Sequence, residues 1–152
     1  MLKSKNSRQL KVYAMKAPTA ARVIPTQVHG ILDYTVGTLI AIAPWLFGFA
    51  KRKPETIIPL LLGSGAFVYS LLTDYELGLF DVLTMRTHLM IDFASGLLLA
   101  GAPWLFGFAK RNWLPHLLLG ILEIAAVLLS DPEPYKKQVF PGLKAGMKAA
   151  VA

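Results

Sequence analysis

The chain of 152 residues contains no cysteine and few acidic residues. Without cysteine, neither a disulfide framework nor a thiolate metal site can form. Only nine Asp and Glu residues stand against 16 Lys and Arg residues, which gives a formal net charge of +7. The cations lie in tails and short loops, and no recognisable nucleic-acid-binding module accompanies them. We therefore expect membrane lipids with anionic headgroups as the counter-charge, and no nucleic acid partner.

The long apolar segments lack the polar stripe that a helix facing water would need. Residues 28–49 carry only His29 and Asp33 as ionisable groups. About 22 residues at 1.5 Å each span a hydrocarbon core of roughly 30 Å. Residues 57–73, 88–108 and 113–130 resemble this segment, and 55% of the chain is hydrophobic. The sequence therefore predicts four transmembrane helices.

One stretch of the chain occurs twice. Residues 29–52 recur without a gap at 88–111, and fifteen of the 24 aligned pairs are identical. After a loop shortened in the second copy, residues 60–63 align with 117–120, and residues 71–74 with 128–131. Each repeat unit is therefore a helical hairpin.

This pattern predicts an all-α membrane protein. Its four transmembrane helices form two tandem helical hairpin repeats, related by a pseudo-two-fold axis along the membrane normal. The expected parts are a basic, interfacial N-terminal tail (1–27), a first hairpin (28–73), an acidic interfacial connector (74–87), a second hairpin (88–131) and a basic C-terminal tail (132–152).

The distribution of Lys and Arg predicts the orientation. Eleven of these residues lie on the side that holds both termini, and five lie on the other side. We therefore expect both termini in the cytoplasm. The N-terminal tail holds six cations and no acid, and no small-residue cleavage site follows a short apolar core, which argues against a secretory signal peptide. A mitochondrial presequence is the alternative to a plain cytoplasmic tail.

A polar and small-residue stripe runs along the first helix of each hairpin, at a spacing of four residues. It consists of His29, Asp33, Gly37 and Ala41 in the first copy and His88, Asp92, Gly96 and Ala100 in the second. Ionisable groups are costly in lipid, so this face should point toward protein. The small residues allow close helix approach. We therefore expect the first and third transmembrane helices to meet through these faces.

The His and Asp pairs have several interpretations. The plainest is a hydrogen-bonded i,i+4 pair at a helix start, where a carboxylate also suits the helix dipole. If the repeat brings His29, Asp33, His88 and Asp92 together near the cytoplasmic face, they would suit a divalent metal ion, and the two imidazoles alone would suit a haem. A histidine followed by an aspartate one turn later is a common pattern, so we assign no metal and leave the cofactor open.

Two further ionisable residues lie in the fourth apolar segment. Glu123 aligns with Ala66 and so has no counterpart in the first repeat. An acid within a span is a functional candidate; the alternative is a structural acid, in its protonated form, bonded to Ser64 or Tyr69. His116 begins the segment, and an interfacial position explains it.

Each first helix carries a Pro-Trp pair near its end, at Pro44-Trp45 and Pro103-Trp104. A proline removes one backbone hydrogen bond, so we expect a kink or an early helix end. The aromatic residues that follow should lie at the headgroup level as an interfacial belt; they are Trp45, Phe47, Phe49, Trp104, Phe106 and Phe108.

The two Pro-Trp-Leu-Phe-Gly-Phe runs resemble those of the SPW repeat family of small bacterial integral membrane proteins. The serine of the family motif is alanine in both copies, at Ala43 and Ala102. The resemblance covers residues 28–131, and it implies a membrane-embedded hairpin repeat in a bacterial inner membrane. It supplies no catalytic residue.

The sequence contains no nucleophile-base pattern, no phosphate loop and no large soluble region. We therefore expect a non-enzymatic structural or accessory component of a membrane assembly, formed with further copies of the chain or within a larger complex. One alternative is a proton-linked transporter or channel that acts as an oligomer through Asp33, Asp92 and Glu123. A second alternative is haem or metal binding through His29 and His88.

Overall fold

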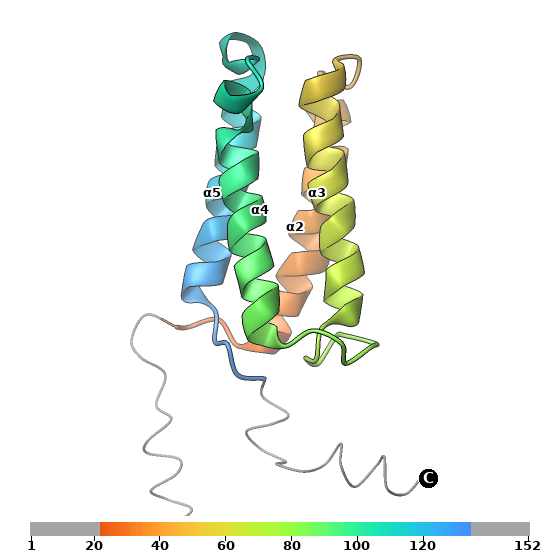
Figure 1. Ribbon diagram of the computed structural model, residues 1–152, viewed down its shortest axis with the longest axis vertical. Coiled ribbons are helices and arrows are strands. Elements are labelled where there is room, and N and C mark those ends of the chain that lie inside the picture. The colour runs from red at the N-terminus through yellow and green to blue at the C-terminus, as the bar shows by residue number, and fades with distance from the viewer. Residues whose placement is uncertain (1–21, 135–152) are drawn as a thin grey trace, which may run out of the picture.

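The computed structural model describes residues 22–134, which form a bundle of helices (Figure 1). The helices are α2 (Thr26–Leu46), α3 (Lys53–Leu72), α4 (Met85–Leu105) and α5 (Ala109–Leu129). The predicted all-α fold with four helices is confirmed for this part of the chain. The expectations for residues 1–21 and 135–152, including most of the cations used for the orientation, lie outside the described residues.

Three of the helices, α3, α4 and α5, are long and apolar enough to cross a membrane. The helix α2 has the same length as α4 and α5, 21 residues, and stands beside them (Figure 1). It carries hydroxyl residues such as Thr35 and Thr38. Their side chains donate hydrogen bonds to the helix's own carbonyls, at Ile31 and Tyr34, and so need no water. The fourth crossing stays a prediction.

The closest packing lies within each hairpin, between α2 and α3 and between α4 and α5. A methyl group added at Gly63 would lie 2.5 Å from the carbonyl oxygen of Gly37, and one at Gly120 would lie 2.6 Å from that of Gly96. The stripe was expected to join the first and third helices, α2 and α4. That is wrong for its small residues, which pack within each hairpin, and right for its histidines and aspartates. Close approach is tightest where both helices offer a glycine, and the matching glycines lie on the second helix of each hairpin.

The repeated Pro-Trp-Leu-Phe-Gly-Phe run ends a helix and reverses the chain. The helices α2 and α4 end two residues after their prolines, and the glycines that follow have positive φ angles, +73° at Gly48 and +74° at Gly107. The amide of the next phenylalanine donates to the proline carbonyl, at 2.8 Å in both copies. This is the Schellman arrangement, in which glycine avoids the strain of the left-handed conformation.

This turn separates the aromatic residues that we expected in one interfacial belt. Trp45 and Trp104 are 60% and 57% exposed, as a belt requires, but Phe49 and Phe108 are only 2% and 1% exposed. The expectation is wrong for these two phenylalanines. The glycine turn directs both rings into the bundle, where they pack against His116.

The connector between the hairpins, residues 73–84, consists of turns and carries no regular helix. Tyr75 is 1% exposed and packs in a small core with Met85 and Leu89. Leu79 and Val82, in contrast, are about 70% exposed (71% and 69%). The connector therefore closes the same end of the bundle at which residues 22–25 and 130–134 lie (Figure 1).

Candidate functional site

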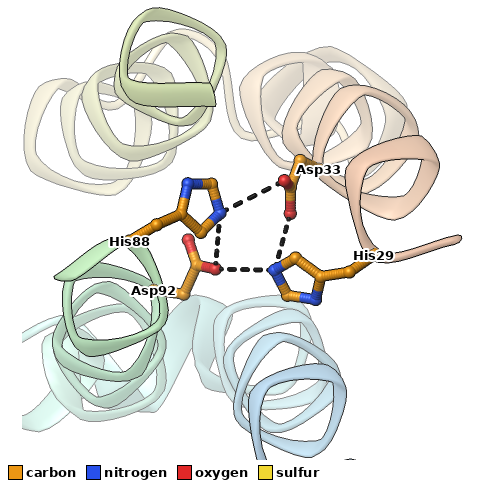
Figure 2. A group of neighbouring side chains, drawn as sticks. All are labelled: His29, Asp33, His88 and Asp92. Atoms are coloured by element: carbon orange, nitrogen blue, oxygen red, sulfur yellow. Dashed lines mark hydrogen bonds and ion pairs between the residues drawn. The ribbon is translucent and has the colours of Figure 1, made fainter. Parts of the chain in front are cut away.

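The structure brings the repeated histidines and aspartates into one cluster between α2 and α4 (Figure 2). His29 is the fourth residue of α2, and His88 is the fourth residue of α4. Each aspartate follows one helical turn later and so lies on the same face. The cluster consequently sits near the end of the bundle that holds the connector.

The four side chains form a closed ring of short contacts. His29 Nε2 lies 3.1 Å from an oxygen of Asp33 and 3.1 Å from one of Asp92. His88 Nε2 lies 3.1 Å and 3.0 Å from oxygens of the same two carboxylates. No side chain in the ring is more than 7% exposed. Each residue offers one atom that can bind a metal ion, and these four atoms all lie within 4.8 Å of one another.

Two hydroxyl groups fix the orientation of the imidazole rings. The hydroxyl of Ser130 donates to the carbonyl of Ala126 (2.6 Å), and its oxygen lies 2.7 Å from His29 Nδ1. A hydroxyl has one proton, so this oxygen must accept a hydrogen bond from Nδ1–H. Both nitrogens of His29 are thereby assigned: Nδ1 carries a proton, and Nε2 faces the ring.

The second histidine is held in the same way. The hydroxyl of Thr73 donates to the carbonyl of Tyr69 (2.6 Å) and lies 2.8 Å from His88 Nδ1. His88 therefore also has a proton on Nδ1 and presents Nε2 to the carboxylates. This Nε2 atom is buried and makes no hydrogen bond with any residue in the described part of the chain, although two carboxylate oxygens lie at ion-pair distance.

Two tyrosines hold the carboxylates. Tyr69 donates to Asp92 Oδ1 at 2.5 Å, and Tyr75 donates to Asp33 Oδ2 at 3.0 Å. Burial, together with the neighbouring Asp33 carboxylate, raises the pKa of Tyr75 above its ordinary value. Its phenol consequently remains a donor at neutral pH. Each of the four clustered residues thus has a hydrogen-bond partner outside the ring that orients it.

The ring is electrically balanced in two ways. Two imidazolium ions neutralise the two carboxylates, and so does one divalent cation held by two neutral imidazoles. In the second case each Nε2 offers a lone pair, and Nδ1–H bonded to a hydroxyl is the outer-shell arrangement that orients metal-binding histidines. A buried charged group needs such compensation in either state.

The same geometry excludes a haem between the two histidines. Their ring centroids are 5.4 Å apart at an interplanar angle of 73°, and both carboxylates contact the Nε2 atoms that would bind the iron. The adjoining cavity has a volume of about 30 Å³. A porphyrin cannot fit there, so the haem alternative is wrong.

Glu123 lies beside the cluster and lines that cavity together with His29, Asp33 and Asp92. We expected a structural acid to bond to Ser64 or Tyr69, but the Tyr69 hydroxyl donates its proton to Asp92. Glu123 Oε2 is buried and has no hydrogen-bond partner among residues 22–134. The expected bond to Tyr69 is therefore not formed, and a functional role for Glu123 stays a prediction.

A second polar group lies at the other end of the bundle. His116 is 1% exposed, so its side chain lies inside the bundle, and its expected interfacial depth stays a prediction. Its ring nitrogens lie 2.9 Å and 3.0 Å from the carbonyl oxygens of Asn112 and Glu55. The Glu55 side chain is fully buried and accepts a hydrogen bond from Arg111 Nε at 2.9 Å. These contacts join α3 to α5, and the non-helical backbone at Asn112 (φ −139°, ψ 46°) accommodates them.

Sequence reasoning missed the residues that support the ring, and it missed Glu55. Thr73 and Ser130 occupy equivalent positions in the aligned segments 71–74 and 128–131. A hydroxyl at the same position of both repeats was the available signal. Glu55 gave no comparable signal, because it lies between the aligned segments 29–52 and 60–63, where the second repeat is shorter, and because a glutamate in a first helical turn is common.

Comparison with known proteins gives one match. The family model of the SPW repeat domain matches residues 27–130, which include both hairpins and all four residues of the ring. No curated protein and no solved structure matches the chain.

Proposed function

The chain belongs to the SPW repeat family, and we propose that this small membrane protein binds one divalent transition-metal ion in the ring of His29, Asp33, His88 and Asp92. The observation that carries the proposal is the orientation of the two imidazoles. Hydroxyl groups occupy both Nδ1 atoms, so both Nε2 atoms face the two carboxylates. Four potential ligand atoms are thereby directed at one point.

The ligand set indicates the class of metal. Imidazole nitrogens suit zinc, iron, nickel and copper, whereas carboxylates alone favour magnesium, calcium or manganese. Two nitrogens with two oxygens therefore favour a borderline divalent ion such as Zn²⁺, Co²⁺ or Fe²⁺. The chain has no cysteine, so the thiolate ligands that favour Cu⁺ are missing.

The proposed role is non-enzymatic. The site contains the residue types of a catalytic triad, namely Ser130, His29 and Asp33. However, Ser130 is only 1% exposed, and its hydroxyl donates its proton to the carbonyl oxygen of Ala126. It therefore cannot give this proton to the imidazole, as a nucleophilic serine must. A metal ion in the ring would instead join the two hairpins, whose mutual contacts are fewer than those within each hairpin.

The cellular setting is part of the proposal. We propose a bacterial inner membrane, with both termini in the cytoplasm and the metal site near that face, which the distribution of Lys and Arg supports. The protein would act as an accessory component, as an oligomer or within a larger assembly. Cross-linking in native membranes tests this part, since a strictly monomeric protein without partners would contradict it.

Metal binding is tested on the full chain in detergent. After treatment with a chelator, the protein is titrated with Zn²⁺ or Co²⁺ by calorimetry, and we expect one ion per chain. The double variant Asp33→Asn, Asp92→Asn keeps the side-chain shapes and removes both charges, so affinity should fall by at least about 100-fold. Circular dichroism checks that the variant remains helical. A wild-type protein that binds none of these ions would refute the proposal.

A proton-linked transporter is the second candidate, because Asp33, Asp92 and Glu123 line one cavity. Acids that share an intramembrane cavity are typical of proton pathways. Pyranine-loaded liposomes test for proton flux. Wild-type vesicles without flux, or equal flux from the Asp92→Asn, Glu123→Gln double variant, would exclude this candidate.

A further inference from the structure

The ring of His29, Asp33, His88 and Asp92 has two unequal sides. The cavity of about 30 Å³ is lined by His29, Asp33 and Asp92, but His88 does not reach it. A buried water needs roughly 10–15 Å³ of such volume and at least two polar partners. The cavity therefore has room for one or two water-sized ligands directly beside the ring.

Glu123 supplies the polar wall of this cavity. The residue is 9% exposed, and its Oε2 atom has no hydrogen-bond partner among the described residues. Tyr69 also lines the cavity, but its proton is bonded to Asp92. Buried carboxyl oxygens are nearly always paired, so an unpaired one indicates a missing partner that is a ligand or solvent.

The repeat makes this carboxyl more informative. Ala66, the residue that aligns with Glu123 in the first hairpin, lines the same cavity. One repeat therefore contributes a methyl group, and the other contributes a carboxyl group. The asymmetry leaves the four-residue ring unchanged and affects only its cavity side.

We propose that the metal site has an open coordination position that faces the cavity, where an exchangeable water molecule binds the ion and donates a hydrogen bond to Glu123 Oε2. This inference rests on the metal binding proposed above. A closed structural metal site takes all its ligands from protein, whereas a site that exchanges ligands keeps one position for water. Small anions should replace this water, and Glu123 Oε2, which accepts a hydrogen bond from the water, should oppose an anion that brings no proton.

Cobalt is the probe, because its visible absorption reports coordination number and ligand exchange. The full chain is loaded with Co²⁺ in detergent and titrated with azide. We expect a spectral change that saturates in the wild-type protein. Glu123→Gln keeps the side-chain shape and offers an amide N–H donor in place of the acceptor oxygen, so it should bind azide about tenfold more tightly. The matched control is Glu133→Gln, the same change at a surface residue paired with Arg86, which should leave azide affinity unchanged.

The possible results are distinct. If the protein binds no Co²⁺, the proposed function itself fails. If Co²⁺ binds and azide leaves the wild-type spectrum unchanged, the open position is refuted while metal binding stands. If azide binds equally to wild type and Glu123→Gln, Glu123 does not contact the exchangeable ligand. The wild-type titration decides the first two results even if Glu123→Gln fails to fold.

Discussion

Replacement of Gly63 by alanine tests the packing that positions the site. A methyl group at this position would lie 2.5 Å from the backbone nitrogen of Ala41 and 2.5 Å from the carbonyl oxygen of Gly37. Both atoms belong to the backbone of α2 and cannot rotate away. The helices α2 and α3 would therefore have to separate, which would also displace His29 and Asp33 in the ring.

The chain provides a matched control in the same helix. A methyl group at Gly65 would meet no atom within 4 Å. Both substitutions bring the same gain in helix propensity, about 0.8–1.0 kcal/mol. This gain cancels when the two variants are compared, and the cost of overpacking remains, at about 1–3 kcal/mol. Gly63→Ala should be less stable than Gly65→Ala by that amount.

The measurement is unfolding of the detergent-solubilised protein by dodecyl sulfate, followed by circular dichroism. The second repeat offers an independent copy of the experiment, with Gly120→Ala as the clashing variant and Gly101→Ala as the control. Equal unfolding midpoints for the variant and control in both repeats would show that the glycines do not set the distance between the helices, and the reasoning would be refuted.

Three further outcomes are expected. Thr73→Val removes the hydroxyl that orients His88 and should lower Co²⁺ affinity about 10–100-fold; unchanged affinity in a calorimetric titration would contradict the assignment of Nδ1. Gly48→Ala forces a positive φ on alanine and should cost about 1–2 kcal/mol in the unfolding assay, with no loss meaning that the turn rearranges. Arg111→Gln should destabilise more than Arg86→Gln, because Arg111 pairs with a fully buried carboxylate whereas the surface pair of Arg86 contributes about 0–1 kcal/mol; equal unfolding midpoints would argue against the buried pair.

The sequence contains enough information for the helices and for the members of the ring. The apolar segments and the repeat predict two hairpins, and the four-residue spacing places each histidine and aspartate on one face. The spacing does not indicate which neighbouring helix packs against that face. A glycine on α2 can pack against any neighbouring helix, and only the second glycine, at Gly63, selects α3.

Residue composition also does not predict that the Phe49 ring points into the bundle. An aromatic residue near a helix end is typical of a membrane interface, and Trp45 behaves in that way. The positive φ angle of Gly48 reverses the chain between these two residues and changes the direction of the second ring. The local backbone conformation therefore decides whether the ring faces the membrane interface or the bundle. Average residue preferences do not describe that conformation.

A duplicated segment supplies ligands in pairs, and this limits what the repeat alone can build. Two copies of a histidine and an aspartate give two imidazoles and two carboxylates, a balanced set that closes around one divalent ion. A chemical difference between the cavity side of the ring and its other side comes from residues that the repeats do not share. Glu123 opposite Ala66 is such a difference, and it lies on the wall of the cavity beside the ring. The identical positions therefore account for the proposed metal binding, and the unequal pair accounts for the proposed ligand exchange.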